Sequence, residues 1–459
     1  MILKNRLTEG NILKVLTKLA LPIMGTSFVQ MAYSMMDMIW LGRVGSKAVS
    51  ASGTAGFFTW LAMAFIILPK IGAEVGVSQS VGKDDYDGAK KYVRHTIQMV
   101  VVLGLLYGTT LIIFRDSFIG FFKLSDSVTD MAIDYLVIVS LGIVFYFINP
   151  VFTAIFNGYG DSKTPFRINA IALSVNLLLD PILIFGVGPI PSLGVKGAAI
   201  ATITAQFIGT MVFVFSIRKK RELTKDLHLL KRPEGAYIKR IVKLGFPVGL
   251  QNGSFTIFAM LIGRIISGWG DTPIAVQKVG SQIEAISWMT AGGFQTALSA
   301  FVGQNYGAKK WDRIYKGYYT GMKIVGVIGI FATCLLIFGA RPIFSFFIPD
   351  EPETIEQGVI YLRILGLSQF FMCVEIATSG AFNGLGKTVP PSIIGIIFTG
   401  LRVPAAYILS RTSLGLNGVW WSISMSSVFK GLILPTMFMI YLKKNPNIVR
   451  RRKRIDNRE

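Results

Sequence analysis

The sequence predicts an all-α integral membrane protein with twelve transmembrane helices in two pseudo-symmetric six-helix bundles. Its 459 residues are 52% hydrophobic and their mean hydropathy is +0.55, which is too apolar for a set of soluble domains. Apolar runs of about twenty residues, the length that a bilayer requires, alternate with polar connections. Four short motifs of the first half also return, in the same order, in the second half.

The twelve apolar runs define the predicted spans in chain order. We place them at residues 14–40, 47–80, 92–115, 131–155, 165–187, 194–217, 241–266, 274–303, 312–339, 358–380, 388–410 and 416–442. Several are longer than a bilayer needs, which indicates tilt or extension into the cytoplasm.

The repeated motifs lie at matching places in the two halves. The repeats pair Leu19-Ala-Leu-Pro22 with Leu244-Gly-Phe-Pro247, Ser78-Gln-Ser-Val-Gly82 with Val302-Gly-Gln-Asn-Tyr-Gly307, Phe156-Asn-Gly-Tyr-Gly160 with Phe382-Asn-Gly-Leu-Gly386, and Leu193-Gly-Val-Lys-Gly197 with Leu414-Gly-Leu-Asn-Gly418. The chain therefore reads as a duplicated six-helix unit. Because each unit has an even number of spans, both enter the membrane in the same sense, and their pseudo-two-fold axis runs along the membrane normal.

The positions of the basic residues predict the boundaries between lobes and the side of the membrane on which each connection lies. The net charge is +22, and the positive residues cluster in alternate connections and at both termini. By the positive-inside rule, both termini and these connections are cytoplasmic, in a protein of the cell membrane. We expect an N-terminal lobe at 1–217, a basic linker at 218–240, a C-terminal lobe at 241–442 and a basic tail at 443–459. The tail is interpreted as a topology signal that can touch anionic lipid, and nucleic-acid binding is not expected.

Two isolated acids lie inside apolar runs. Asp180 falls within residues 165–187 and Asp37 within residues 20–40. An ionised Asp at the centre of a spanning helix costs roughly 2.5–3.5 kcal/mol on insertion scales, so such a carboxyl needs a partner. Asn176 precedes Asp180 by four residues and shares its helix face. These side chains can converge on a single bound cation.

The repeat shows that these acids belong to one half only. At the repeat offset, Asp37 corresponds to Ile262, Asn176 to Arg402 and Asp180 to Ala406. A structural role shared by the fold should have appeared in both halves. The asymmetry therefore favours a functional role for the acids.

Several motifs resemble those of the multidrug and toxic compound extrusion (MATE) family. They are Ala20-Leu-Pro22, Leu41-Gly-Arg-Val-Gly45, Phe156-Asn-Gly-Tyr-Gly-Asp161, Ile283-Glu284 and Val302-Gly-Gln-Asn-Tyr-Gly-Ala308. The resemblance implies two six-helix lobes around a central cavity, and export of organic cations and other amphipathic compounds against entry of Na⁺ or H⁺.

The resemblance also implies a coupling site in the N-terminal lobe. Asp37, Asn176 and Asp180 match the family's cation-site positions, and Thr202 is expected to supply a hydroxyl from the sixth helix. Their oxygens suit Na⁺, and the same carboxylates could carry a proton, so the coupling ion stays open and no other cofactor is expected. Where the NorM-type branch carries an acid in the seventh helix, this chain has Gln251-Asn-Gly-Ser-Phe255, which indicates the DinF-like branch.

Other residues are candidates for substrate contact or movement. Gln30 and Tyr33 share the helix face of Asp37 and could line a substrate path or bond between helices. Glu284 could meet a cationic drug or pair with a base. Lys70 and Glu74 are spaced for an internal ion pair, and Pro22 is a hinge candidate.

The expected function is that of a monomeric secondary antiporter for drug-like molecules that works by alternating access among membrane lipids. The alternative from the same superfold is a lipid-linked oligosaccharide flippase, which would need a cavity lined with Arg and Lys. An enzyme is not expected, because the sequence offers no nucleophile, base or metal constellation, and its two histidines lie in basic cytoplasmic regions. A passive channel would not need acids confined to one lobe.

Overall fold

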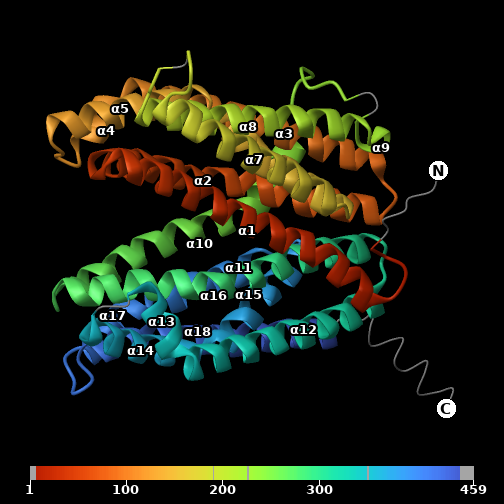
Figure 1. Cartoon of the computed structure of the whole chain (residues 1–459). Coiled ribbons are helices and arrows are strands. Elements are labelled where there is room, and N and C mark those ends of the chain that lie inside the picture. Colours follow the sequence, from red (N-terminus) through yellow and green to blue (C-terminus); the bar gives the residue numbers. More distant parts are fainter. Residues whose placement is uncertain (1–6, 190, 225–226, 349–350, 445–459) are drawn as a thin grey trace. The chain divides into compact units, whose positions relative to one another are not determined.

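The computed structural model describes residues 7–189, 191–224, 227–348 and 351–444, which form helices joined by short connections (Figure 1). The helices are α1 Ile12–Val44, α2 Ser46–Gly82, α3 Tyr86–Ile113, α4 Arg115–Gly120, α5 Asp126–Leu141, α6 Ile143–Tyr159, α7 Lys163–Phe185, α8 Val195–Arg218, α9 Arg221–Thr224, α10 Gly235–Ser267, α11 Asp271–Gly307, α12 Trp311–Phe338, α13 Ala340–Phe347, α14 Pro352–Gly366, α15 Gln369–Gly384, α16 Val389–Gly400, α17 Arg402–Leu409 and α18 Leu416–Lys444. Most of the predicted C-terminal tail, 445–459, lies outside the described residues.

Spans predicted as single helices are broken in three places. The span at 131–155 is the pair α5 and α6, bent by 52°, and the span at 358–380 is α14 and α15, bent by 48°. The span at 388–410 is divided between α16 and α17. At the first break, Gly142 lacks the Cβ that would collide with the Ile203 side chain of α8, so the two chains approach closely there.

By length and composition, nine helices among the described residues are apolar enough to cross a membrane when α16 and α17 are counted as one, and the two bent pairs bring the number to eleven. The twelfth predicted span is α11, which forms a helix of 37 residues but does not meet the same test. Its sequence includes Gln277, Lys278, Gln282 and Glu284. Polar residues at membrane depth normally face the interior of a bundle rather than lipid.

The helices pack as two compact units. The first contains Leu21–Gly245, and the second contains the segment ending at Ala20 together with the residues from Phe246 onward. In the first unit α2 packs on α3 and α6, and α7 lies along α8; in the second, α11 packs on α12 and α15, and α17 lies along α18 (Figure 1). The predicted boundaries of lobes, linker and tail remain a prediction.

A repeated glycine explains one of the duplicated motifs. A Cβ on Gly158 of α6 would lie 2.8 Å from the carbonyl oxygen of Glu74 in α2, and a Cβ on Gly384 of α15 would lie 2.5 Å from that of Ser299 in α11. Both distances are too short for any other residue. The Phe-Asn-Gly motif therefore sets the same close approach of two helices in each half.

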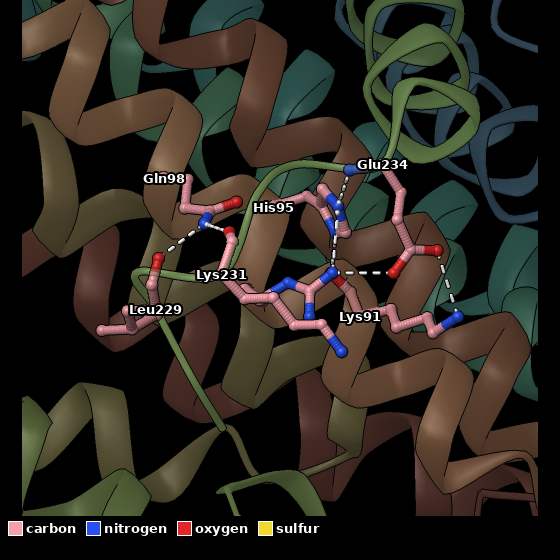
Figure 2. Close-up of polar contacts among 7 residues, drawn as sticks. Lys91, His95, Gln98, Leu229, Lys231 and Glu234 are labelled. Atoms are coloured by element: carbon pink, nitrogen blue, oxygen red, sulfur yellow. Dashed lines mark hydrogen bonds and ion pairs between the residues drawn. The ribbon is translucent and has the colours of Figure 1, made fainter. Parts of the chain in front are cut away.

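The segment before α10 is bound to α3 (Figure 2). Lys91 Nζ and Arg94 Nη2 donate to the carboxylate of Glu234 at 3.1 and 2.7 Å. The backbone N–H of Glu234 donates to His95 Nε2 at 2.8 Å, and the His95 ring stacks on Tyr237 with 5.1 Å between centroids. These contacts fix where α10 begins.

Gln98, one turn further along α3, holds the same segment by its side-chain amide. Its Nε2 donates to the carbonyl oxygens of Leu229 and Lys231 at 2.5 and 2.8 Å (Figure 2). Part of the predicted basic linker is therefore an ordered arm of the first unit.

The segment before α1 is held in a similar way within the second unit. Arg313 of α12 donates to the carbonyl oxygens of Leu7, Glu9 and Gly10, and the backbone N–H of Leu7 donates to Gln304 Oε1 at 3.1 Å. The repeat partner of Gln304 is Gln79, whose Oε1 accepts from Arg240, in the second turn of α10, at 3.2 Å. Equivalent glutamines of the duplicated scaffold thus bind the beginning of α10 in one unit and the segment before α1 in the other.

The arm before α10 yields a first prediction. The carboxylate of Glu234 accepts hydrogen bonds from Lys91 and from Arg94, and these bonds hold its pKa below the usual value. The contribution of this carboxylate to stability is therefore present above about pH 4.3, the ordinary pKa of Glu, and is lost as pH falls through the lower folded value. At neutral pH, Glu234→Gln should give faster amide hydrogen exchange in residues 227–235.

A matched control is Asp87→Asn, which removes an exposed pair with Lys90 on the same helix. It should leave exchange in residues 227–235 unchanged. Equal exchange in wild-type protein and Glu234→Gln would show that the carboxylate does not hold the arm.

Candidate cation site

The candidate site lies in the first unit, where α7 presents two of the predicted residues to its interior. Asn176 and Asp180 are both fully buried, and Asn176 Nδ2 donates to Asp180 Oδ1 at 3.1 Å. The bond joins residues one helical turn apart, as their spacing predicts. It uses one oxygen of Asp180 and leaves the other available.

Asp37 of α1 meets this pair from a different helix. Its carboxyl group lies close enough to that of Asp180 to interact with it electrostatically, and Thr202 Oγ1 of α8 donates to Asp37 Oδ2 at 3.5 Å. Two neighbouring carboxylates repel each other when both are ionised. Because neither acid forms a salt bridge within the described part of the chain, the pair requires a proton or another cation.

Three buried oxygen atoms in the site have no hydrogen-bond partner among the described residues. They are Asp37 Oδ1, Asn176 Oδ1 and Asp180 Oδ2. All three are acceptors, and buried acceptors normally have a donor or a cation against them. Carboxylate and amide oxygens are also the ligands preferred by hard cations. The described residues contain no cluster of three or more His, Cys, Asp or Glu side chains, so this site combines two acids with neutral oxygens.

Two tyrosines enclose the acids. The hydroxyl of Tyr33, on α1, donates to the carbonyl oxygen of Thr202 at 3.3 Å. Tyr135 of α5 is buried and lies close enough to both acids to interact with them electrostatically. The sequence analysis missed Tyr135, since a lone Tyr in an apolar run gives no sign of its partners.

The remaining candidates of α1 are Gln30 and Pro22. The side chain of Gln30 is exposed, although it shares a helix face with Asp37. Pro22 lies inside α1, and Thr26 Oγ1 donates to its carbonyl oxygen at 3.0 Å. A proline within a helix removes one backbone hydrogen bond, so this part of α1 is easier to bend.

The second unit has apolar residues where the first has acids. Ile262 and Ala406, the repeat partners of Asp37 and Asp180, belong to one buried apolar cluster with Ile266 and Val419. The duplicated scaffold thus brings equivalent positions together in both units. In the second unit the contact is an ordinary apolar one that needs no ion.

Glu284 lies in the second unit, in α11. Its carboxylate accepts from Gln369 Nε2 at 3.4 Å. Its two predicted roles, contact with a cationic drug and pairing with a base, both stay predictions. In the first unit, Glu74 is buried and Lys70 is half-buried.

A duplicated helical fold of apolar spans, with a pair of neighbouring acids that forms no salt bridge among the described residues, is typical of a class, the polytopic membrane transporters. The chain belongs to the MatE family, whose sequence model matches residues 22–182 and again residues 247–408. The two matches begin 225 residues apart (247 − 22) and end 226 apart (408 − 182), which agrees with the internal repeat.

The chain is similar over almost its whole length to curated transporters. It is 28% identical to the probable multidrug resistance protein NorM of Thermotoga maritima over 449 residues, 96% of this chain and 95% of the relative. It is 22% identical to the FAD transporter of Shewanella oneidensis, covering 94% of this chain and 95% of the relative. With NorM proteins among the relatives, placement near the DinF-like branch stays a prediction.

Solved structures of MATE proteins share the fold. A crystal structure of a MATE point mutant has a TM-score of 0.89 at 23% identity, covering 97% of this chain and 100% of its own. A crystal structure of MATE in the bent conformation has a TM-score of 0.88 at 24% identity, covering 95% and 98%. This likeness confirms the predicted all-α integral membrane fold.

The geometry of the site yields a second prediction. Thr202→Val removes the hydroxyl that donates to Asp37 while keeping the side-chain shape. A lost hydrogen bond of this kind contributes on the order of 1 kcal/mol, so the midpoint of cation-dependent thermal stabilisation should shift by roughly fivefold. The midpoint is measured on purified protein titrated with Na⁺ and, separately, with acid.

Thr110→Val is the matched control, because Thr110 is exposed and its hydroxyl bonds to the carbonyl oxygen of Leu106 in the same helix, α3. It should titrate as wild type. A midpoint unchanged by Thr202→Val would remove Thr202 from the site.

Proposed function

We propose that the protein is a secondary active antiporter that exports organic cations or amphipathic drugs in exchange for Na⁺ or H⁺ by alternating access. The observation that carries this proposal is the placement of Asp37 near Asp180 inside the first unit, with three buried oxygens left without partners among the described residues. Uncompensated carboxylates at this depth are costly. A cation that binds at the two carboxylates removes this energetic cost.

Coupling follows from competition for this charge. With the site facing outward, Na⁺ or H⁺ neutralises Asp37 and Asp180, and a bound cationic drug loses its attraction and leaves. With the site facing inward, the ion departs and the acids again favour a cationic drug. Each inward unit charge gains roughly 2.3 kcal/mol per 100 mV of membrane potential. One ion exchanged for one monovalent drug is therefore voltage-neutral and draws on the concentration gradient.

Both candidate ions suit the site. Na⁺ would be held by the carboxylates of Asp37 and Asp180 and the side-chain oxygens of Asn176 and Thr202. A proton would be shared between the two carboxyl groups, which would then titrate as a coupled pair. Separate gradients of the two ions distinguish these cases.

Movement of α1 would link the ion to the drug. Pro22 is the proposed hinge, because it weakens the helix on which Asp37 lies. Gln30, Tyr33 and Glu284 are proposed substrate contacts. The protein would work as a monomer in the cell membrane with both termini in the cytoplasm.

The relatives' names support the substrate class. The Thermotoga relative is a probable multidrug resistance protein, and another similar protein, from Staphylococcus haemolyticus, is the multidrug export protein MepA, 23% identical over 447 residues. The flippase alternative is not favoured by these similarities. Its pyrophosphate-bearing substrate would also be repelled by an acid pair.

The proposal gives a third prediction, tested by dye efflux from proteoliposomes under separately imposed Na⁺ and pH gradients. Asp180→Asn should fold and insert as wild type but lose ion-driven efflux, because the neutral amide no longer needs a cation. Asp37→Asn should do the same. One gradient, not both, should drive the wild-type protein if a single ion is coupled.

Asp134→Asn serves as a matched control, since Asp134 is a carboxylate of the same unit that forms a half-exposed ion pair with Lys196. It should retain efflux. Unchanged ion-driven efflux by both Asp37→Asn and Asp180→Asn proteins would refute the proposed site.

A further inference from the structure

His95 of α3 is a fully buried histidine that the proposed ion cycle does not use (Figure 2). Its Nδ1 lies 2.6 Å from the carbonyl oxygen of Lys91, one turn earlier in the same helix. A carbonyl oxygen can only accept a hydrogen bond, so Nδ1 carries a proton. Nε2 accepts from the backbone N–H of Glu234 at 2.8 Å, so this second nitrogen carries none. The geometry therefore requires a neutral ring that is protonated at Nδ1 alone.

A second donor faces the same ring nitrogen. Arg94 Nη2 lies 3.4 Å from His95 Nε2, while it donates to the carboxylate of Glu234 at 2.7 Å. A guanidinium group only donates hydrogen bonds and keeps its charge. A proton added to Nε2 would thus meet both a backbone N–H and a permanent cation. His95 would then lose its bond to the arm, which is the segment 227–235.

The charges around the ring do not compensate for such a proton. The charged groups that act on it are Lys91 and Arg94 of α3 and Glu234 of the arm. Tyr237 of α10 stacks on the face of the ring, with 5.1 Å between centroids. The carboxylate of Glu234 already accepts from both bases, so the three residues together carry one positive charge. A protonated His95 would raise that charge to two.

The second unit has no titratable side chain at the equivalent place. α3 and α12 begin 225 residues apart (311 − 86), so the repeat partner of His95 is Thr320. Thr320 Oγ1 donates to the carbonyl oxygen of Lys316 at 2.8 Å, the same bond to the preceding turn that His95 makes. In that unit Arg313 and Gln304 hold the segment before α1, and neither titrates between pH 5 and 8. The acid-sensitive contact therefore belongs to the arm of the first unit.

We propose that His95 is a pH-sensitive switch, in which protonation of Nε2 releases the arm from α3. A released ring regains the ordinary pKa of histidine, about 6.5, whereas the docked ring excludes the second proton. Because the released form binds more protons, docking is favoured above about pH 6.5 and weakens as pH falls below it.

The arm forms part of the connection between the two units. α10 begins directly after it, and the chain passes from the first unit to the second after Gly245 of this helix. Acid on the side of the membrane where the arm lies, which is predicted to be the cytoplasm, would therefore free part of this connection. The inference does not rest on the proposed antiport.

The test is amide hydrogen exchange of the purified full chain at pH 7.5 and 5.5, corrected for the intrinsic pH dependence of exchange. Protection of residues 227–235 should fall by up to about tenfold at pH 5.5, since a released histidine with a pKa of about 6.5 is then mostly protonated. Glu234 stays ionised over this interval, because its hydrogen bonds from Lys91 and Arg94 lower its pKa. Protection of residues 7–11, the equivalent segment before α1, should not change.

Three variants isolate the ring. His95→Gln is the conservative one, because the side-chain oxygen of glutamine can accept the N–H of Glu234 and does not titrate. It should abolish the pH dependence of exchange in the arm. His95→Leu offers no acceptor and should give fast exchange at both pH values. His228→Gln is the matched control, since it changes an exposed histidine of the arm itself, and it should behave as wild type.

A second measurement does not require any variant of His95 to keep its fold. The chain has two histidines, and His228→Gln leaves His95 as the one ring that gives a ¹⁵N NMR signal. At pH 7.5 this signal should be that of the neutral ring protonated at Nδ1. A ring protonated at Nε2, equal protection of the arm at both pH values, or a pH dependence that persists in His95→Gln would each overturn the proposal. None of these readings depends on transport.

Discussion

The structure depends on the free-energy cost of placing an ionised carboxylate in a low-dielectric interior. Asp37 and Asp180 lie near each other in the first unit, and no salt bridge neutralises either acid within the described residues. The energetic cost of this arrangement falls when a small cation occupies the site. That single constraint accounts for the unpartnered oxygens, the neighbouring Asn176 and Thr202, and the proposed exchange of ion for drug.

The second unit has the same helix scaffold without the acid pair, so it shows what the acids add to the first unit. Both units use the same helix pairings and the same close glycine contact between two helices. Where the first unit has acids, however, the second has Ile262 and Ala406 in an apolar cluster. Among its own buried charges, Lys430 pairs with Glu375. A common framework thus carries an acid pair in one unit and an apolar contact at the equivalent positions of the other.

Much of the fold could be predicted from the sequence because a bilayer requires long apolar runs, which are visible locally. The duplicated motifs gave a second, independent indication of the two six-helix units. Helix breaks such as Gly142 escaped prediction, since they depend on neighbours distant in sequence, as with Ile203. The acids of the candidate site stood out against apolar surroundings. Tyr135 and the Lys430–Glu375 pair did not, because their partners are set by packing between helices that no local pattern reveals.

The central claim, that drug and cation compete for one acid pair, is tested most directly by ion release. Purified protein loaded with Na⁺ or H⁺ is mixed with a cationic drug in weakly buffered solution, and released ions are measured with a Na⁺-selective electrode and a pH indicator. The account predicts release of about one cation for each drug bound by wild type and none by Asp37→Asn/Asp180→Asn, given the charge balance required at membrane depth. Drug binding without release of either ion by wild type would contradict it.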